Sequence, residues 1–179
     1  AILKYPNTKV YAIDRDKITK KYADTLREKY PKRFNFYQDK FSNLEKIIDI
    51  KIKPKAIIFD LGISSYQLAD LKRGFSFFSK GILNMEMGFN KYTALSVINK
   101  LDKKHLGNVI KVLGEEKHGR IIANKIFKER SLKPIKSTEE LVKIINEAKG
   151  NYKKSKKNPA TKTFQAIRIL VNQELTELM

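Results

Sequence analysis

Three short strand-like runs that alternate with helical patterns, two of them followed directly by an aspartate, constrain the fold of this sequence most. Residues 10–13 form the first run, and Asp14 follows it. A helical pattern with apolar residues four apart leads to a second run at 34–37. The third run, 56–59, is continuous and ends at Asp60, as in strands buried on both faces of a parallel sheet. This alternation of strands and helices predicts an α/β fold with an open sheet.

Ligands of open α/β sheets bind outside the carboxyl ends of the strands, which places Asp14, Phe41 and Asp60 on the expected functional edge. A carboxylate at a strand end can accept hydrogen bonds from both hydroxyls of a ribose. Asp14 is therefore a candidate ribose ligand, although Asp14 or Asp16 can instead cap the next helix. Phe41 can equally be a core residue, and Asp60 can simply end its strand. The spacing alone fits a nicotinamide cofactor as well as S-adenosylmethionine.

Helical periodicity replaces the strand-like runs in the second half of the chain. Thr93 and Asp102 are predicted N-caps, and the segment from Ser137 to Glu140 fits a capping box. We therefore predict a helical insertion in the α/β fold.

Composition excludes several functional classes and favours a polyanionic partner. The chain of 179 residues has no cysteine and two histidines, which excludes disulfides, thiolate zinc sites, cysteine nucleophiles and histidine-rich metal centres. We expect no membrane span and a cytoplasmic setting. Lys and Arg number 38 against 19 Asp and Glu, a net charge of +19 that suits nucleic acid. The lysine excess can also merely solvate the surface, or serve an acidic or membrane-surface partner.

Several long motifs, in a fixed order, make the sequence resemble the ribosomal RNA small subunit methyltransferase H family from Val10 onwards. The motifs are Asp60–Gln67 (DLGISSYQ), Arg73–Phe77 (RGFSF), Leu83–Met87 (LNMEM), Gly114–Glu116 (GEE), Arg120–Ile126 (RIIANKI) and Asn158–Arg168 (NPATKTFQAIR). The resemblance implies an enzyme that uses S-adenosylmethionine to methylate the exocyclic amino nitrogen of a cytidine in small-subunit rRNA, free or in the assembled subunit.

The resemblance also implies a Rossmann-like methyltransferase sheet interrupted by an all-helical subdomain that helps to hold the RNA. On this basis we assign residues 1–72 to the cofactor-binding portion and 73–157 to the helical insertion. Residues 158–179 are assigned to a helix that returns to the methyltransferase domain. The family's first strand and Gly-Gly-His loop are expected before Ala1, and its closing strands after Met179. The 179 residues alone are therefore expected to bind the cofactor weakly and to be inactive.

Matching the motifs residue by residue gives candidate cofactor ligands. Asp14 would bind the ribose, Phe41 would lie beside the adenine, and Asp60 and Gln67 would complete the contacts. Asp60 is also the candidate for positioning the target amine. Methyl transfer to an amine needs alignment of the reacting atoms and no covalent nucleophile, and we expect no metal.

Two arginines and a lysine-rich segment are the candidate RNA contacts. Arg73 and Arg168 can grip a phosphate with two hydrogen bonds or stack on a base, or can instead form intramolecular ion pairs. The lysines expected to contact phosphates, or otherwise to belong to a solvated linker, are Lys153, Lys154, Lys156 and Lys157. Among Phe75, Phe77 and Phe78, which can offer a stacking surface, at least two are expected in the core.

Four positions depart from the family pattern. Tyr66 stands where proline is usual, and Asn84, Glu86 and Gly88 replace an expected Asp, Arg and Asp. These substitutions fit either a divergent enzyme that still works or a relaxed constraint on how the substrate is held. Two other functions therefore stay open: a catalytically silent RNA-binding or ribosome-assembly protein that keeps the fold, and, more remotely, a nicotinamide-dependent oxidoreductase.

Overall fold

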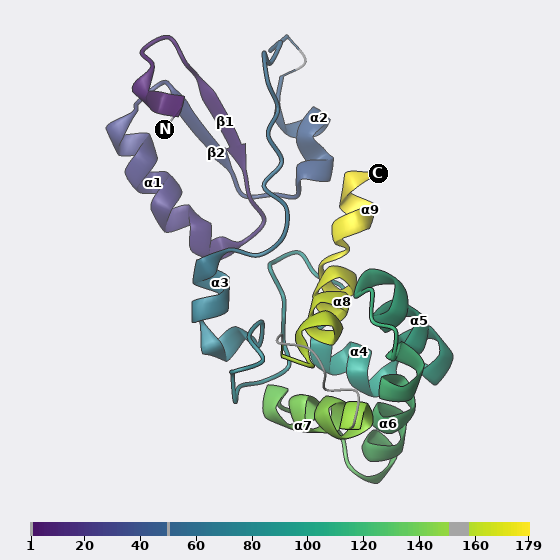
Figure 1. The fold of residues 1–179 in the computed structure, drawn as a ribbon. Coiled ribbons are helices and arrows are strands. Elements are labelled where there is room, and N and C mark those ends of the chain that lie inside the picture. The colour runs from purple at the N-terminus through teal and green to yellow at the C-terminus, as the bar shows by residue number, and fades with distance from the viewer. Residues whose placement is uncertain (1, 50, 151–157) are drawn as a thin grey trace. The chain divides into compact units, whose positions relative to one another are not determined.

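The structure, a computed structural model, describes residues 2–49, 51–150 and 158–179 (Figure 1). The chain divides into two compact units. We call the first the sheet unit; it comprises Ala1–Asp60, Met87–Phe89 and Leu175–Met179. We call the second the helical unit; it comprises Leu61–Glu86 and Asn90–Glu174.

The sheet unit is built on a strand–helix–strand segment, as the sequence predicts. Strands β1 (Val10–Ile13) and β2 (Phe34–Tyr37) pair in parallel, with Val10 opposite Phe34. A 3-10 turn, η2 (Lys17–Thr19), and helix α1 (Lys20–Lys29) connect the strands, and α1 packs against β2. Figure 1 shows the helix lying along the strand pair. The carboxyl ends of both strands therefore meet at one edge.

Short elements complete the sheet unit. They are η1 (Ile2–Lys4), η3 (Phe41–Asn43), α2 (Leu44–Ile47) and most of α9 (Glu174–Leu178). Phe34 and Ala23 are buried between β2 and α1, and Met87 is buried too. These residues form the small core of the sheet unit.

The prediction of a buried strand at 56–59 is wrong. These residues form no strand, and Ile57, Ile58 and Phe59 are 56%, 74% and 53% exposed. A parallel strand needs neighbours that satisfy its backbone groups. Among the described residues, β1 pairs only with β2, and no strand lies alongside 56–59.

The helical unit packs amphipathic helices around a shared apolar core. Its helices are α3 (Ser65–Ala69), η4 (Leu71–Arg73), α4 (Ala94–Lys100), α5 (Lys103–Leu113), α6 (Gly119–Leu132), α7 (Thr138–Lys149) and α8 (Thr161–Asn172). Helix α5 packs on α6 and α8, and α6 also packs on α7. Four of these helices each bury a pair of side chains four residues apart, which is the periodicity of one helix face. The pairs are Leu106 and Ile110, Ile122 and Ile126, Leu141 and Ile145, and Ile167 and Val171.

The predicted helix starts are confirmed. Thr93 accepts the Ser96 N–H, Asp102 accepts the His105 N–H, and Ser137 accepts the Glu140 N–H at the starts of α4, α5 and α7. Each of these side chains satisfies one of the backbone N–H groups that a helix start leaves without an intrahelical partner.

The two compact units differ in extent from the ranges that the sequence suggested. The helical unit begins at Leu61 instead of residue 73, and α8 packs on α5 and α4 within it. Of the segment 158–179, only Leu175–Met179 belongs to the sheet unit. The roles given to those ranges remain predictions. No helix in the described ranges combines the length and apolar character that a membrane crossing requires.

Candidate functional site

The loop after β1 contains two carboxylates with different structural roles. Asp16 is buried and caps η2, because its Oδ1 accepts the Ile18 N–H at 3.1 Å. Asp14 ends the strand, and its Oδ1 accepts the Asp16 N–H at 2.7 Å. Since Asp16 supplies the cap, Asp14 is not needed for it. The sequence left open which of the two caps the helix, and the structure assigns that role to Asp16.

The Asp14 carboxyl lies in an environment that resists ionisation. Burial raises its pKa, and the nearby charges of Asp16 and Asp60 raise it further, while the hydrogen bond from the Asp16 N–H and the charge of Arg15 act in the opposite direction. The net shift is upward. Perturbed carboxyl groups of this kind often mark functional sites.

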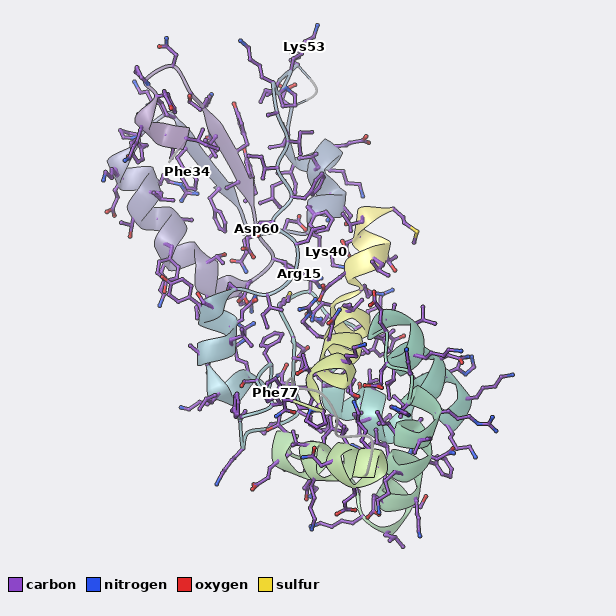
Figure 2. The ribbon with its side chains drawn as sticks, viewed as in Figure 1. Arg15, Phe34, Lys40, Lys53, Asp60 and Phe77 are labelled. Atoms are coloured by element: carbon purple, nitrogen blue, oxygen red, sulfur yellow. The ribbon has the colours of Figure 1, made fainter. Side chains whose placement is uncertain are left out.

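Asp60 and Asp14 belong to the same edge of the sheet unit. Asp60 is exposed, and its charge is close enough to raise the pKa of Asp14. Figure 2 shows Asp60 near the carboxyl ends of the two strands. The structure therefore brings together two of the predicted cofactor ligands.

Phe41 occupies the corresponding place after β2. It begins η3 and is half-buried. Its ring meets the Phe59 ring edge-on, with 5.7 Å between centroids and 73° between planes. Phe59 directly precedes Asp60, so an aromatic pair lies beside the carboxylate. An apolar ring face next to hydrogen-bond acceptors suits a ligand with both a planar base and hydroxyl groups.

Gln67 belongs to the helical unit, where it stabilises the start of α3. Its Oε1 accepts the Ser64 N–H at 2.9 Å, and Ser64 Oγ accepts the Gln67 N–H at 3.2 Å. This reciprocal capping box explains why the side chain is buried. The predicted contact of Gln67 with a cofactor stays a prediction.

The two candidate RNA-binding arginines both have intramolecular partners. Arg73 donates to the Glu86 carbonyl oxygen at 2.6 Å, and its guanidinium lies 5.1 Å from the centre of the Phe75 ring. Arg168 forms a two-point ion pair with Glu174, at 2.8 and 2.9 Å. Arg168 thus forms the intramolecular ion pair that the sequence left open, whereas Arg73 contacts a backbone oxygen and an aromatic ring. RNA contact by either arginine stays a prediction, and the four candidate lysines lie outside the described residues.

The phenylalanines after Arg73 differ in exposure. Phe75 is buried, Phe77 is half-buried against Phe164, and Phe78 is 76% exposed. Of the three, Phe78 offers the most ring surface to a base. Phe75, Phe77 and Phe164 also line an apolar pocket of about 160 Å³, with Arg168 on its wall. No pattern in the sequence indicated this pocket.

Three of the departures from the family pattern have local explanations. Asn84 Oδ1 accepts the Glu86 N–H at 2.8 Å, which a carboxylate could do equally. Glu86 accepts a hydrogen bond from Arg73 through its backbone oxygen, a contact that any residue at this position could make. Gly88 lies against Arg15, whose Nε donates to the Gly88 oxygen at 2.7 Å. Nothing in the structure explains Tyr66, whose side chain is exposed.

Sequence reasoning missed the segments that hold the strand-end loops. Gly88 contacts the loop after β1, and Glu177 of α9 contacts the loop after β2 through Lys40 and Ser42. Both contacts join residues far apart in the chain, so local patterns carry no signal for them. Within the described part of the chain, no group of three or more His, Asp or Glu residues is arranged to hold a metal ion.

A parallel strand pair with carboxylates and an aromatic pair at its carboxyl edge defines an α/β protein with a candidate ligand site at that edge. Residues 1–179 match the MraW methylase family, and the chain therefore belongs to that family.

Proteins named ribosomal RNA small subunit methyltransferase H are similar to the chain over 99% of its length. The identities are 45% for Wolbachia pipientis subsp. Culex pipiens (strain wPip), 42% for Ehrlichia chaffeensis and 41% for Orientia tsutsugamushi (strain Ikeda). The chain spans 61% of the length of the first two and 58% of the third.

Proposed function

We propose that the protein methylates the exocyclic amino nitrogen of a cytidine in small-subunit rRNA, with S-adenosylmethionine as methyl donor. One observation of the structure carries the proposal: Asp14 and Asp60 lie close together at the carboxyl edge of the strands, in a chain of the MraW methylase family. The names of the similar proteins support rRNA as the substrate.

The side chains of the site suit S-adenosylmethionine. A ribose offers two hydroxyl donors, and the Asp14 carboxylate can accept them because Asp16 performs the capping. Adenine offers a flat, weakly polar face. The Phe41 ring, which is partly exposed in the loop after β2, could pack against that face. Asp60 and Gln67 are proposed to complete the contacts. When bound, the donor supplies an electrophilic methyl group on a sulfonium.

Positioning is the main task left to the protein. In the proposed reaction the carbon–sulfur bond would break as the carbon–nitrogen bond forms, S-adenosylhomocysteine would leave, and the proton released by the nitrogen would go to solvent. Holding nitrogen, carbon and sulfur in line can supply much of the acceleration. Asp60 is exposed at the edge, where its carboxylate can accept a hydrogen bond from the amine and orient it.

RNA is proposed as the partner of the basic surface. The net charge of +19 favours association with phosphates through counterion release. Arg73, Arg168 and the lysines at 153, 154, 156 and 157 are the proposed contacts. Because both arginines have intramolecular partners, their contact with RNA would require sharing or exchange of those partners. A protein that acts on the small subunit would work in the cytoplasm.

A catalytically silent RNA-binding or ribosome-assembly protein is the second candidate, because the same charge explains RNA binding without chemistry. Membership of a methylase family argues against the oxidoreductase.

Transfer of labelled methyl groups to small subunits distinguishes the two candidates. The substrate is small subunits from a strain that lacks the native methyltransferase, and the catalyst is the full-length protein. We expect label at a cytidine amine. Binding to the subunits without any label would favour the silent protein instead.

A further inference from the structure

The carboxylate of Glu177, on the C-terminal helix α9, reaches the loop after β2. Its Oε1 accepts a hydrogen bond from Lys40 Nζ at 2.6 Å, and its Oε2 accepts one from Ser42 Oγ. All three residues belong to the sheet unit. Figure 2 shows Lys40 beside α9.

This contact is largely shielded from water. The side chain of Glu177 is 8% exposed and that of Lys40 is 20% exposed. Burial by itself would raise the pKa of Glu177, but the hydrogen bonds from Lys40 and Ser42 and the charges of Lys40 and Arg15 outweigh it, so the pKa lies below its usual range. Glu177 is therefore ionised at neutral pH and satisfied at both oxygens. Hydrogen bonds to an ionised group are stronger than neutral ones.

The two donors flank Phe41 in the sequence. Lys40 and Ser42 turn toward Glu177, whereas the Phe41 ring meets Phe59. The loop also has internal contacts, since Asp39 Oδ1 accepts from the Lys40 N–H and from Asn43 Nδ2. Lys40, the N-cap residue of η3, provides no side-chain cap. Glu177 is thus the contact that ties the loop on both sides of Phe41 to a distant part of the chain.

We propose that Glu177 is a positioning residue for the methyl donor: it fixes the backbone on both sides of Phe41 and so presents the Phe41 ring to the adenine. The inference rests on the proposed function, in which Phe41 lies beside the adenine. Glu177 itself touches neither the donor nor the reacting atoms. Without Glu177 the loop around Phe41 is less ordered. Binding of the methyl donor must then order the loop, and the conformational entropy lost in doing so lowers the affinity.

The test is the affinity of the full-length protein for S-adenosylhomocysteine, measured by calorimetry. We expect E177A to weaken binding about tenfold. E177Q, which keeps an acceptor for Ser42 but loses the charge, should restore part of the affinity. With saturating methyl donor, kcat should be unchanged while KM for the donor rises. E28A, at an exposed glutamate of α1, is the matched control and should bind as wild type does.

A double-mutant cycle with Phe41 separates positioning from general destabilisation. If Glu177 acts through Phe41, the F41L/E177A protein should bind no more weakly than F41L alone. If E177A does not fold, S42A and K40M each remove one donor and should each weaken binding by a smaller factor.

Three results would overturn the inference. Wild-type affinity in E177A, additive losses in the cycle, or a loss in kcat alone would each show that Glu177 does not position Phe41. A wild-type protein that binds no S-adenosylhomocysteine would instead remove the proposed function itself, and this inference with it.

Discussion

Gly88 shows how a glycine can fix the loop that follows β1. Its φ of +131° is one that residues with a side chain rarely adopt. A Cβ atom at this position would lie 2.4 Å from the Arg15 carbonyl oxygen. The Arg15 side chain binds the Gly88 oxygen in return. Because Arg15 lies between Asp14 and Asp16, this close approach holds the loop that carries the proposed ribose ligand. A larger residue at position 88 would displace that loop.

We expect G88A to lower the free energy of unfolding and to weaken cofactor binding. G62A is the matched control, since Gly62 also has a positive φ, +107°, but its Cβ would meet nothing within 4 Å. Backbone strain alone should cost about 1–3 kcal/mol at either site, and G88A should cost more because of the clash. Urea unfolding of both variants measures the difference. Equal losses would show that the approach to Arg15 is not a constraint.

At the scale of elements, a buried ion pair joins three parts of the helical unit. Lys149 at the end of α7 donates to Glu116 Oε2 at 2.7 Å and to the Pro159 carbonyl oxygen at 3.1 Å. Glu116 precedes α6 and Pro159 precedes α8. The two side chains are 12% and 4% exposed, for Lys149 and Glu116. The ion pair thus reinforces the packing of these helices. Because both side chains are buried, removal of either charge would leave the other without a compensating partner.

We expect K149M to destabilise the protein by about 3–5 kcal/mol, because it leaves Glu116 charged and buried without its partner. The double variant E116Q/K149M should recover most of this loss. Urea unfolding measures all three proteins.

The same pair predicts a pH dependence of known sign. Burial would raise the pKa of Glu116, but the hydrogen bonds from Lys149 and the His118 N–H lower it overall. In the wild type this contribution to stability is therefore present at neutral pH and is lost as the pH falls through the folded-state pKa. In K149M the hydrogen bond from Lys149 is gone, so burial should raise the pKa of Glu116. Protonation of Glu116 then removes the cost of a buried, unpaired charge. The stability gap between wild type and K149M should narrow between neutral pH and about pH 4; a constant gap would contradict this account.

The elements differ in how well local sequence determines them. Helix starts at Thr93, Asp102 and Ser137 could be predicted, because a cap involves residues two or three apart. The predicted strand at 56–59 is a different case, because it depends on more than local sequence. Its apolar composition shows that it is suited to burial, but a strand also requires a neighbour, and the described residues provide none. Local patterns therefore predicted helices better than strand pairing.

At the scale of the whole molecule, topology grouped three residues of the candidate site but not the segments that contact their loops. The rule that ligands bind at the carboxyl ends of parallel strands placed Asp14, Phe41 and Asp60 on one edge, and the structure places all three in the sheet unit. It did not predict Gly88 or Glu177, which reach the strand-end loops from distant segments. Such contacts depend on tertiary packing and leave no periodic signal in the sequence.

Calorimetry of the full-length protein with S-adenosylmethionine, for wild type, D14N and D60N, shows whether the strand-end carboxylates hold the methyl donor. D14N keeps an oxygen for the Asp16 N–H, so the fold should survive, while the charged ribose acceptor is lost. Calorimetry should show binding to wild type, a loss of about tenfold or more in D14N and a clear loss in D60N. D24N, at a residue of α1 whose side chain is 44% exposed and pairs with Arg27, should bind as wild type. Unchanged affinity in both D14N and D60N would show that these strand-end carboxylates do not hold the methyl donor.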